Sequence, residues 1–277
     1  MKSFVQRTLT TVIGVPVIFV LIYCLPQCNH LAFAILVYAA SLLGSYELKT
    51  MLDKSEATHT SLPFWAPSLL IVAAWVETYY EHLPLTDFSL LILALVSFST
   101  EIINKGRDDF RFSLSHTSAS ALLLLYPSFF FTFLIKVSDL QDSIYLLLLF
   151  FLLVFGNDTF AYLFGVAFGK NNRGVLKVSP NKSIAGFVGG TLSTVVLSML
   201  YCHFIKIGIN IWQSLLLGLA ISFSANVGDL IESSFKRAAG MKDSGTIVPG
   251  RGGILDSIDS LVASAPFFWV LCIFFIK

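Results

Sequence analysis

Long hydrophobic stretches alternate along this chain with short polar segments. Most of the stretches contain about 20 residues, the length at which an α-helix crosses the hydrocarbon core of a bilayer. The pattern predicts nine transmembrane helices at approximately Thr8–Leu25, Leu31–Leu52, Leu62–Tyr80, Leu83–Thr100, Ser118–Val137, Ser143–Gly165, Ile184–Gly208, Ile211–Phe235 and Asp256–Ile276. Proline or charge interrupts the third and fourth stretches and their joining loop is short, so re-entrant or interfacial helices are the alternative for these two.

The composition agrees with a membrane protein. Of the 277 residues, 56% are hydrophobic and 13% are charged, whereas a soluble domain carries about 25% charged residues. We therefore predict an all-α integral membrane protein, a polytopic bundle that forms a single domain over residues 1–277. The net charge of +1 gives no indication of nucleic-acid binding. The sequence shows no internal repeat, so it does not support a transporter built from inverted repeats.

Basic residues are distributed unequally between the two sides of the predicted bundle. Of the 18 Lys and Arg residues, 15 fall on one side, and only Lys136, Lys206 and Lys277 fall on the other. The positive-inside rule places the basic side, and with it the N-terminus, in the cytoplasm. Lys2 and Arg7 also suit a signal peptide, but no A-x-A cleavage site follows, which favours a retained first helix. Size and the lack of an organellar signal favour the bacterial plasma (inner) membrane.

Acidic residues within the apolar segments distinguish two parts of the chain. The N-terminal helices (1–142) carry one acid well inside a segment, Glu47, whereas residues 143–277 carry five near predicted cytoplasmic helix ends. These five are Asp158, Asp229, Glu232, Asp256 and Asp259. A carboxylate costs about 2.5–3.5 kcal/mol at the centre of a membrane helix and less near its ends, so it normally marks function. Simple hydration is the alternative for any one acid but explains five poorly. We assign the catalytic helices and cytoplasmic loops to residues 143–277.

The polar segment Ser233–Ser260 combines residue types that suit phosphate and a metal ion. Its candidates for binding phosphate are Lys236, Arg237, Lys242 and Arg251. Its glycines allow backbone amides to approach an anion. Asp256 and Asp259, three residues apart on a predicted helix, present two carboxylates on one face. A second basic loop, Gly165–Ser183, places Lys182 at a predicted helix start where anions are favoured, although an ordinary positive-inside loop is the alternative interpretation.

Several other chemistries lack support in the sequence. No GxxxxGK[ST] motif is present, which excludes a P-loop ATPase, and the five histidines show no H-E-x-x-H arrangement of a zinc peptidase. Oxygen ligands without a His/Cys cluster favour a hard cation such as Mg²⁺. Cys24 and Cys28 could pair on the outer face, but buried apolar thiols are the favoured interpretation for all four cysteines.

Sequence blocks between Phe155 and Ser260 match a known family. The long block contains Ser234-Phe235-Lys236-Arg237, Lys242-Asp243-Ser244-Gly245, Gly252-Gly253-Ile254-Leu255-Asp256 and Ile258-Asp259-Ser260. The upstream blocks contain Gly156-Asn157-Asp158, Lys177-Val178-Ser179-Pro180-Asn181-Lys182-Ser183 and Gly228-Asp229-Leu230-Ile231-Glu232-Ser233. Together these blocks resemble the signature of the phosphatidate cytidylyltransferases, also called CDP-diacylglycerol synthases.

The resemblance implies an integral-membrane enzyme that converts CTP and phosphatidate into CDP-diacylglycerol and pyrophosphate. It implies dependence on Mg²⁺, with K⁺ also associated with the family's centre. The family's metal-binding carboxylates fall on Asp229, Asp256 and Asp259, and we assign Lys236 and Arg237 to catalysis beside them. The further candidates for substrate binding are Lys182, Ser179, Lys242, Arg251 and Asp158.

Two positions depart from the family signature. The family usually has His where this chain has Arg251, and Arg where this chain has Ser257. One phosphate-binding guanidinium is therefore missing, and another has appeared six residues earlier. We hypothesise that Arg251 supplies the charge lost at Ser257.

Two other functions remain alternatives. A CTP-dependent lipid kinase of the polyprenol or phytol type would share the nucleotide and the membrane, but it would transfer the γ-phosphoryl group and release CDP. A cation-coupled transporter would use the intramembrane acids as an ion path, but it predicts acids near the bilayer midplane. The sequence leaves the oligomeric state open, with a homodimer as one arrangement.

Overall fold

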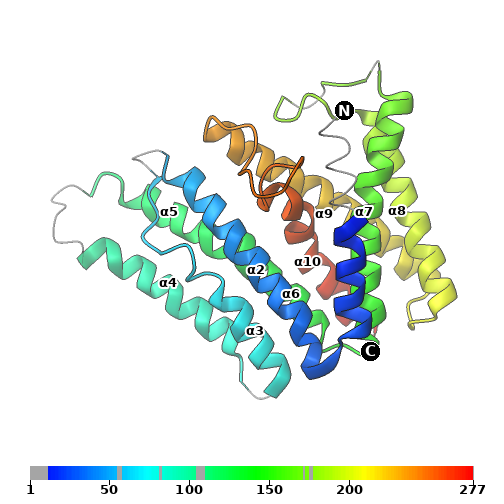
Figure 1. Cartoon of the computed structure of the whole chain (residues 1–277), viewed down its shortest axis with the longest axis horizontal. Coiled ribbons are helices and arrows are strands. Elements are labelled where there is room, and N and C mark those ends of the chain that lie inside the picture. Colours follow the sequence, from blue (N-terminus) through cyan, green and yellow to red (C-terminus); the bar gives the residue numbers. More distant parts are fainter. Residues whose placement is uncertain are drawn as a thin grey trace. The chain divides into compact units, whose positions relative to one another are not determined.

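The computed structural model describes residues 12–54, 58–80, 83–103, 110–170, 172–174 and 177–276. Within these ranges every regular element is helical, and β-pairing is limited to two isolated bridges. The elements in chain order are η1 (Val20–Cys24), α2 (Gln27–Leu52), α3 (Leu69–Tyr80), α4 (Leu85–Ile103), α5 (Ser113–Leu123), η3 (Leu124–Phe129), α6 (Phe130–Val137), α7 (Ser143–Phe168), α8 (Ile184–Ile205), α9 (Ile211–Ala238) and α10 (Leu255–Phe275), shown in Figure 1.

Seven helices of the described chain are long and apolar enough to cross a membrane. They are α2, α4, the continuous segment Ser113–Val137, α7, α8, α9 and α10. Two shorter apolar helices, Val12–Cys24 and α3, correspond to the first and third predicted segments. The all-α polytopic membrane fold is therefore confirmed, and nine is an approximate count. The predicted start of the first segment, Thr8, lies outside the described residues, as do the basic residues Lys2, Arg7, Lys105, Arg107 and Lys277.

The chain divides into two compact units, with one boundary in the connection between α6 and α7 and the other two within α9 and α10. The first unit contains Met1–Asp139 and Phe235–Ile258, and the second contains Leu140–Ser234 and Asp259–Lys277. The boundary after Asp139 lies close to the predicted division at residue 142. The polar segment after α9, however, belongs with the N-terminal helices, and not with the C-terminal ones. The single-domain organisation stays a prediction.

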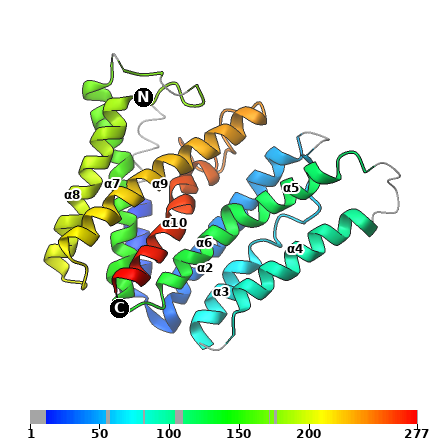
Figure 2. The ribbon, with the colours of Figure 1, turned by 180° about the vertical axis from the view of Figure 1, so that it is seen from behind.

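In the first unit, α3 packs between neighbouring helices, with α2, α4 and α6 in contact with it (Figures 1 and 2). Polar contacts tie helix ends together on both sides of this unit. At one end, the Ser61 hydroxyl donates to Glu101 Oε1 at 2.6 Å. At the other end, Lys136 Nζ lies 3.2 Å from Glu77 Oε1. Each contact therefore joins two segments that meet at the same end of the first unit.

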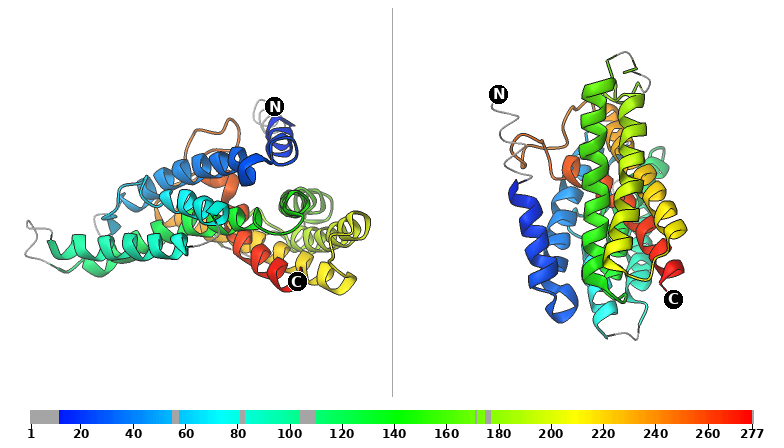
Figure 3. Two further views of the ribbon diagram at one scale, coloured as in Figure 1. Left: turned by 90° about the horizontal axis from the view of Figure 1, so that it is seen from below. Right: turned by 90° about the vertical axis from the view of Figure 1, so that its right-hand side faces the viewer.

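In the second unit, α7 and α8 lie side by side (Figure 3). Glycines on α8 permit this close approach, since a Cβ atom at Gly189 would collide with Phe164. Buried Asn157 on α7 accepts a hydrogen bond from the Ser222 hydroxyl of α9 at 2.8 Å. Close packing and buried side-chain hydrogen bonds of this kind hold helices together in a membrane, where apolar surface alone cannot.

All four cysteines lie in the described chain, and all four are free thiols. Cys202 and Cys272 are buried, as predicted, whereas Cys24 and Cys28 are exposed. The prediction of buried thiols was therefore wrong for Cys24 and Cys28. They lie near the connection between the first helix and α2, where both residues are exposed.

Candidate active site

The polar segment between α9 and α10 folds onto α2 within the first unit. Glu47 of α2 is only 2% exposed, and its carboxylate accepts three hydrogen bonds. The donors are the Ser244 hydroxyl at 2.8 Å, the Ile254 amide at 3.0 Å and the Leu255 amide at 2.9 Å. Because α10 begins at Leu255, Glu47 satisfies amides that the helix leaves without an intrahelical partner. A carboxylate at a helix N-terminus is also favoured by the helix dipole.

The same segment fixes the carboxylate of Asp256. Its Oδ2 accepts from the backbone amides of Ser244 and Gly253, each at 2.8 Å, and from the Ser244 hydroxyl at 2.9 Å. Its Oδ1 forms an ion pair with Lys236 Nζ at 2.5 Å. Charge-assisted hydrogen bonds of this kind are stronger and more directional than neutral ones. Asp256 and Lys236 are therefore held together by the first unit alone.

The glycines of this segment make room for the two carboxylates. A Cβ atom at Gly253 would collide with the Ser244 hydroxyl and with Glu47, and one at Gly245 would collide with Glu47. Gly252 has a φ of 111°, in a region that side chains rarely adopt. The glycines were predicted to bring backbone amides close to an anion. In this structure the anions that they approach are the carboxylates of Glu47 and Asp256.

The other predicted cations of the first unit lie at its surface. Arg237 donates to the Met241 carbonyl at 3.5 Å, and Lys242 and Arg251 are exposed. The Ser257 hydroxyl bonds to the Gly253 carbonyl at 3.3 Å, within the first turn of α10. Compensation of Ser257 by Arg251 is not tested by these contacts and stays a prediction.

The second unit contains another lysine–carboxylate pair. Lys182 Nζ lies 2.6 Å from Asp229 Oδ2 and 5.4 Å from the centre of the Phe187 ring. The adjacent Ser183 caps α8 by accepting a hydrogen bond from the Gly186 amide at 3.1 Å. Ser179 contributes its carbonyl, which accepts from the Lys182 amide at 3.2 Å and shapes the turn before the helix. Lys182 therefore lies directly before the N-cap of α8, next to the helix start that the sequence predicted.

Four acidic side chains gather in the second unit. Asp158, Asp229 and Glu232 lie close enough to Asp259 to interact with it electrostatically. Glu232 and Asp259 are buried, Asp158 is exposed, and the side chain of Asp229 is 37% exposed. Mutual repulsion among these carboxylates would be relieved by a bound cation.

The donor set fits a hard divalent cation such as Mg²⁺. The donors are carboxylate oxygens. Asp229 and Asp256 each already form an ion pair with a lysine ammonium group. Within the described residues, no three side chains of His, Cys, Asp or Glu already form a metal-binding group. Asp256 belongs to the first unit, and Asp229 and Asp259 belong to the second. Their convergence on one ion stays a prediction.

Two residues of this arrangement, Ser244 and Glu47, could not be assigned a role from the sequence alone. Ser244 was recognised as part of the long block, and Glu47 as an acid within an apolar segment. The available signal for Glu47 was its burial in a predicted membrane helix, which requires a partner. Glu47 and Ser244 are 197 residues apart, so no local pattern indicates that they meet.

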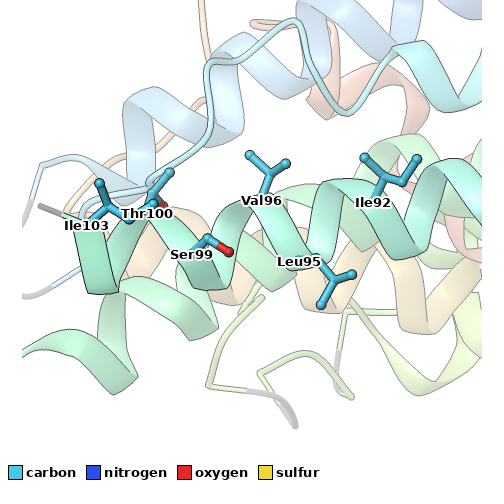
Figure 4. Close-up of a pocket in the computed structure, with 6 residues that line it drawn as sticks. All are labelled: Ile92, Leu95, Val96, Ser99, Thr100 and Ile103. Carbon is cyan, nitrogen blue, oxygen red and sulfur yellow. The ribbon is translucent and has the colours of Figure 1, made fainter.

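A cavity of about 630 Å³ lies along α4 (Figure 4). Its lining residues are Ile92, Leu95, Val96, Ser99, Thr100 and Ile103. The lining is mostly apolar and contains no titratable group. None of the candidate site residues is among the residues that line this cavity.

The long apolar helices define an integral-membrane protein, and its candidate site carries two lysine–carboxylate pairs. The chain belongs to the cytidylyltransferase family, whose model matches residues 5–275. Phosphatidate cytidylyltransferases of Staphylococcus aureus (strain COL) and Staphylococcus haemolyticus (strain JCSC1435) are 31% and 32% identical to it over 275 residues. Each alignment covers 96% of this chain and 98% of the relative. The family resemblance and the prediction of an enzyme are confirmed.

Proposed function

We propose that this chain transfers the cytidylyl group of CTP to phosphatidate, giving CDP-diacylglycerol and pyrophosphate. Family membership and the names of the two relatives support both substrates. The observation that carries the proposal is the arrangement inside the long signature block, where Lys236 and Ser244 hold the Asp256 carboxylate. The fold also supports it, because a membrane protein can reach a lipid substrate in the bilayer.

In the reaction, a phosphate oxygen of phosphatidate attacks the α-phosphorus of CTP. The bond from the α-phosphorus to the bridging oxygen breaks, and pyrophosphate leaves. No strong general base is required, since the second pKa of a phosphomonoester is about 6. Repulsion between two polyanions is the main obstacle, and fixed positive charges lower it. Lys236 and Lys182 are candidates for this role, and an ion pair with an aspartate fixes the position of each ammonium group.

We further propose that Asp229, Asp256 and Asp259 hold Mg²⁺. When bound, the metal would supply positive charge that offsets the phosphate charges and polarises the reacting phosphoryl group. Asp256 is suited to this role because Ser244 and Gly253 fix its orientation. A role for K⁺ rests only on the family resemblance.

The active site is proposed to face the cytoplasm. CTP is a water-soluble nucleotide and phosphatidate carries its headgroup at the membrane surface, so the two substrates meet at an interface. The unequal distribution of basic residues assigns the polar loops to the cytoplasmic side. The bacterial origin of the relatives supports the plasma membrane as the location. A homodimer remains one arrangement of the chain.

Labelled CTP distinguishes the proposed reaction from that of a lipid kinase. With purified protein, phosphatidate and Mg²⁺, label from the α-phosphate of CTP is expected in the lipid, and label from the γ-phosphate in pyrophosphate. Diacylglycerol in place of phosphatidate serves as the control and should yield no labelled lipid. Transfer of the γ-label to a lipid, with release of CDP, would support the kinase alternative and refute the transferase.

Substitution of Arg251 and Ser257, the two residues that differ from the family signature, tests the compensation hypothesis. Arg251→His is expected to lower activity about tenfold, because a guanidinium–phosphate contact is lost. Adding Ser257→Arg to this variant should restore most of the activity, since the charge returns to the position usual in the family. The measurement is kcat/KM for CTP in membranes. Full activity of Arg251→His alone would refute the hypothesis.

A further inference from the structure

Glu47 lies on α2, outside the signature blocks, and yet it contacts the segment Ser244–Leu255, here called the signature loop. We propose that Glu47 is a positioning residue: its carboxylate fixes the signature loop and thereby sets the orientation of Asp256. This inference rests on the proposed function, in which Asp256 is part of the active site. It gives a role to an acid that the transferase chemistry itself does not use.

The contacts of Glu47 show how it acts on the loop. Its two carboxylate oxygens accept from both ends of the signature loop, namely from Ser244 near the start and from Ile254 and Leu255 at the end. The carboxylate thus links the first residue of the signature loop to its last two residues. Because Glu47 is 2% exposed, water cannot replace it as the acceptor for these donors.

Ser244 connects Glu47 to Asp256. Its hydroxyl oxygen lies 2.8 Å from Glu47 Oε2 and 2.9 Å from Asp256 Oδ2. The hydroxyl has one proton and can donate to only one carboxylate at a time. Asp256 Oδ2 already receives the amides of Ser244 and Gly253. A displacement of Glu47 would therefore displace Ser244 and, with it, the backbone amide that donates to Asp256 Oδ2.

The shape of the site requires a carboxylate of this length. Gly245 and Gly253 bring their backbones against Glu47, which leaves no room for a bulkier group. Glutamine has the same shape, but its NH₂ group would face amide and hydroxyl donors. Aspartate keeps the charge, but it is one methylene shorter and cannot span the same contacts. The two variants therefore separate loss of charge from loss of reach.

The test compares Glu47→Gln and Glu47→Asp with a matched control, Glu77→Gln. Glu77 is also a poorly exposed acid of the first unit, and it accepts from the Thr86 amide at 2.7 Å and pairs with Lys136. Two quantities are measured on the full-length protein in nanodiscs. They are amide hydrogen exchange in peptides covering the signature loop, and kcat and KM for CTP.

Glu47→Gln is expected to speed exchange in the signature loop about tenfold, because its amides lose their acceptors. The kcat should fall at least about tenfold, with a smaller change in KM, since misplacement of a reacting group acts mainly on the transition state. Glu47→Asp should lie between Glu47→Gln and the wild type. Glu77→Gln should leave both loop exchange and kcat within about twofold of the wild type.

Unchanged exchange in the signature loop of Glu47→Gln would overturn the proposal, whatever its activity. Faster exchange throughout all helices, without a selective effect on the loop, would overturn it too, because that result describes general destabilisation. Should Glu47→Gln not yield folded protein, Ser244→Ala provides the second variant and is expected to reproduce the loss in kcat. Absence of CDP-diacylglycerol formation by the wild type would refute the proposed function, whereas the exchange result would still decide whether Glu47 holds the loop.

Discussion

Asp256→Asn is expected to abolish CDP-diacylglycerol formation, lowering kcat about 1,000-fold or more. The substitution removes the negative charge that pairs with Lys236. It also places an NH₂ group either against the amides of Ser244 and Gly253 or against the Lys236 ammonium, so that donors face each other. The measurement is incorporation of labelled CTP into lipid by membranes, with the amount of protein in the membrane determined by immunoblot.

Asp87→Asn is the matched control for this experiment. Asp87 is exposed in the first turn of α4, and its substitution should leave incorporation within about twofold of the wild type. Asp259→Asn is expected to be as inactive as Asp256→Asn. Wild-type activity of either variant would remove that carboxylate from the proposed metal site.

Reversal of the Lys182–Asp229 pair is expected to give an inactive protein. If Lys182 binds phosphate and Asp229 binds a metal ion, the double variant Lys182→Asp/Asp229→Lys keeps the ion pair but places each charge at the wrong ligand. We expect the two single variants and the double variant each to lose at least about 100-fold in kcat/KM. Purified proteins are compared by CTP incorporation and by thermal unfolding.

The Lys136–Glu77 pair supplies the control for charge reversal. Its ammonium and carboxylate lie 3.2 Å apart, and no candidate site residue takes part. Reversal there should preserve activity and recover most of the stability that the single variants lose, as expected for a pair that serves structure only. Restoration of activity by the reversed Lys182–Asp229 pair would show that this pair, too, is only structural.

Hydrophobic patterning predicted the helices because a bilayer demands long apolar segments whose backbone bonds internally. It was least accurate where proline intervenes. The third segment was expected from Leu62, but α3 begins at Leu69, because Pro63 and Pro67 interrupt helical hydrogen bonding at the start of the segment. The division into two units could not be predicted, since it depends on which helices pack together, and apolar segments of similar composition do not specify their neighbours.

The candidate site shows the same limit. Charge and glycine content in the polar segment Ser233–Ser260 identified Asp256 and Lys236, and the structure brings these two together. Glu47 received no role because its partners lie about 200 residues away, and hydrogen bonds at that separation leave no periodic or local pattern. Which lysine pairs with which carboxylate likewise depends on helix rotation, which sequence spacing does not determine.

The central proposal is that Asp229 and Asp256 bind the same divalent ion, and Mn²⁺ binding measured by electron paramagnetic resonance tests it most directly. Purified wild-type protein with CTP is expected to bind one Mn²⁺ tightly. Asp256→Asn in the first unit and Asp229→Asn in the second should each weaken binding at least about tenfold. Wild-type affinity for Mn²⁺ in either variant would contradict a shared metal site.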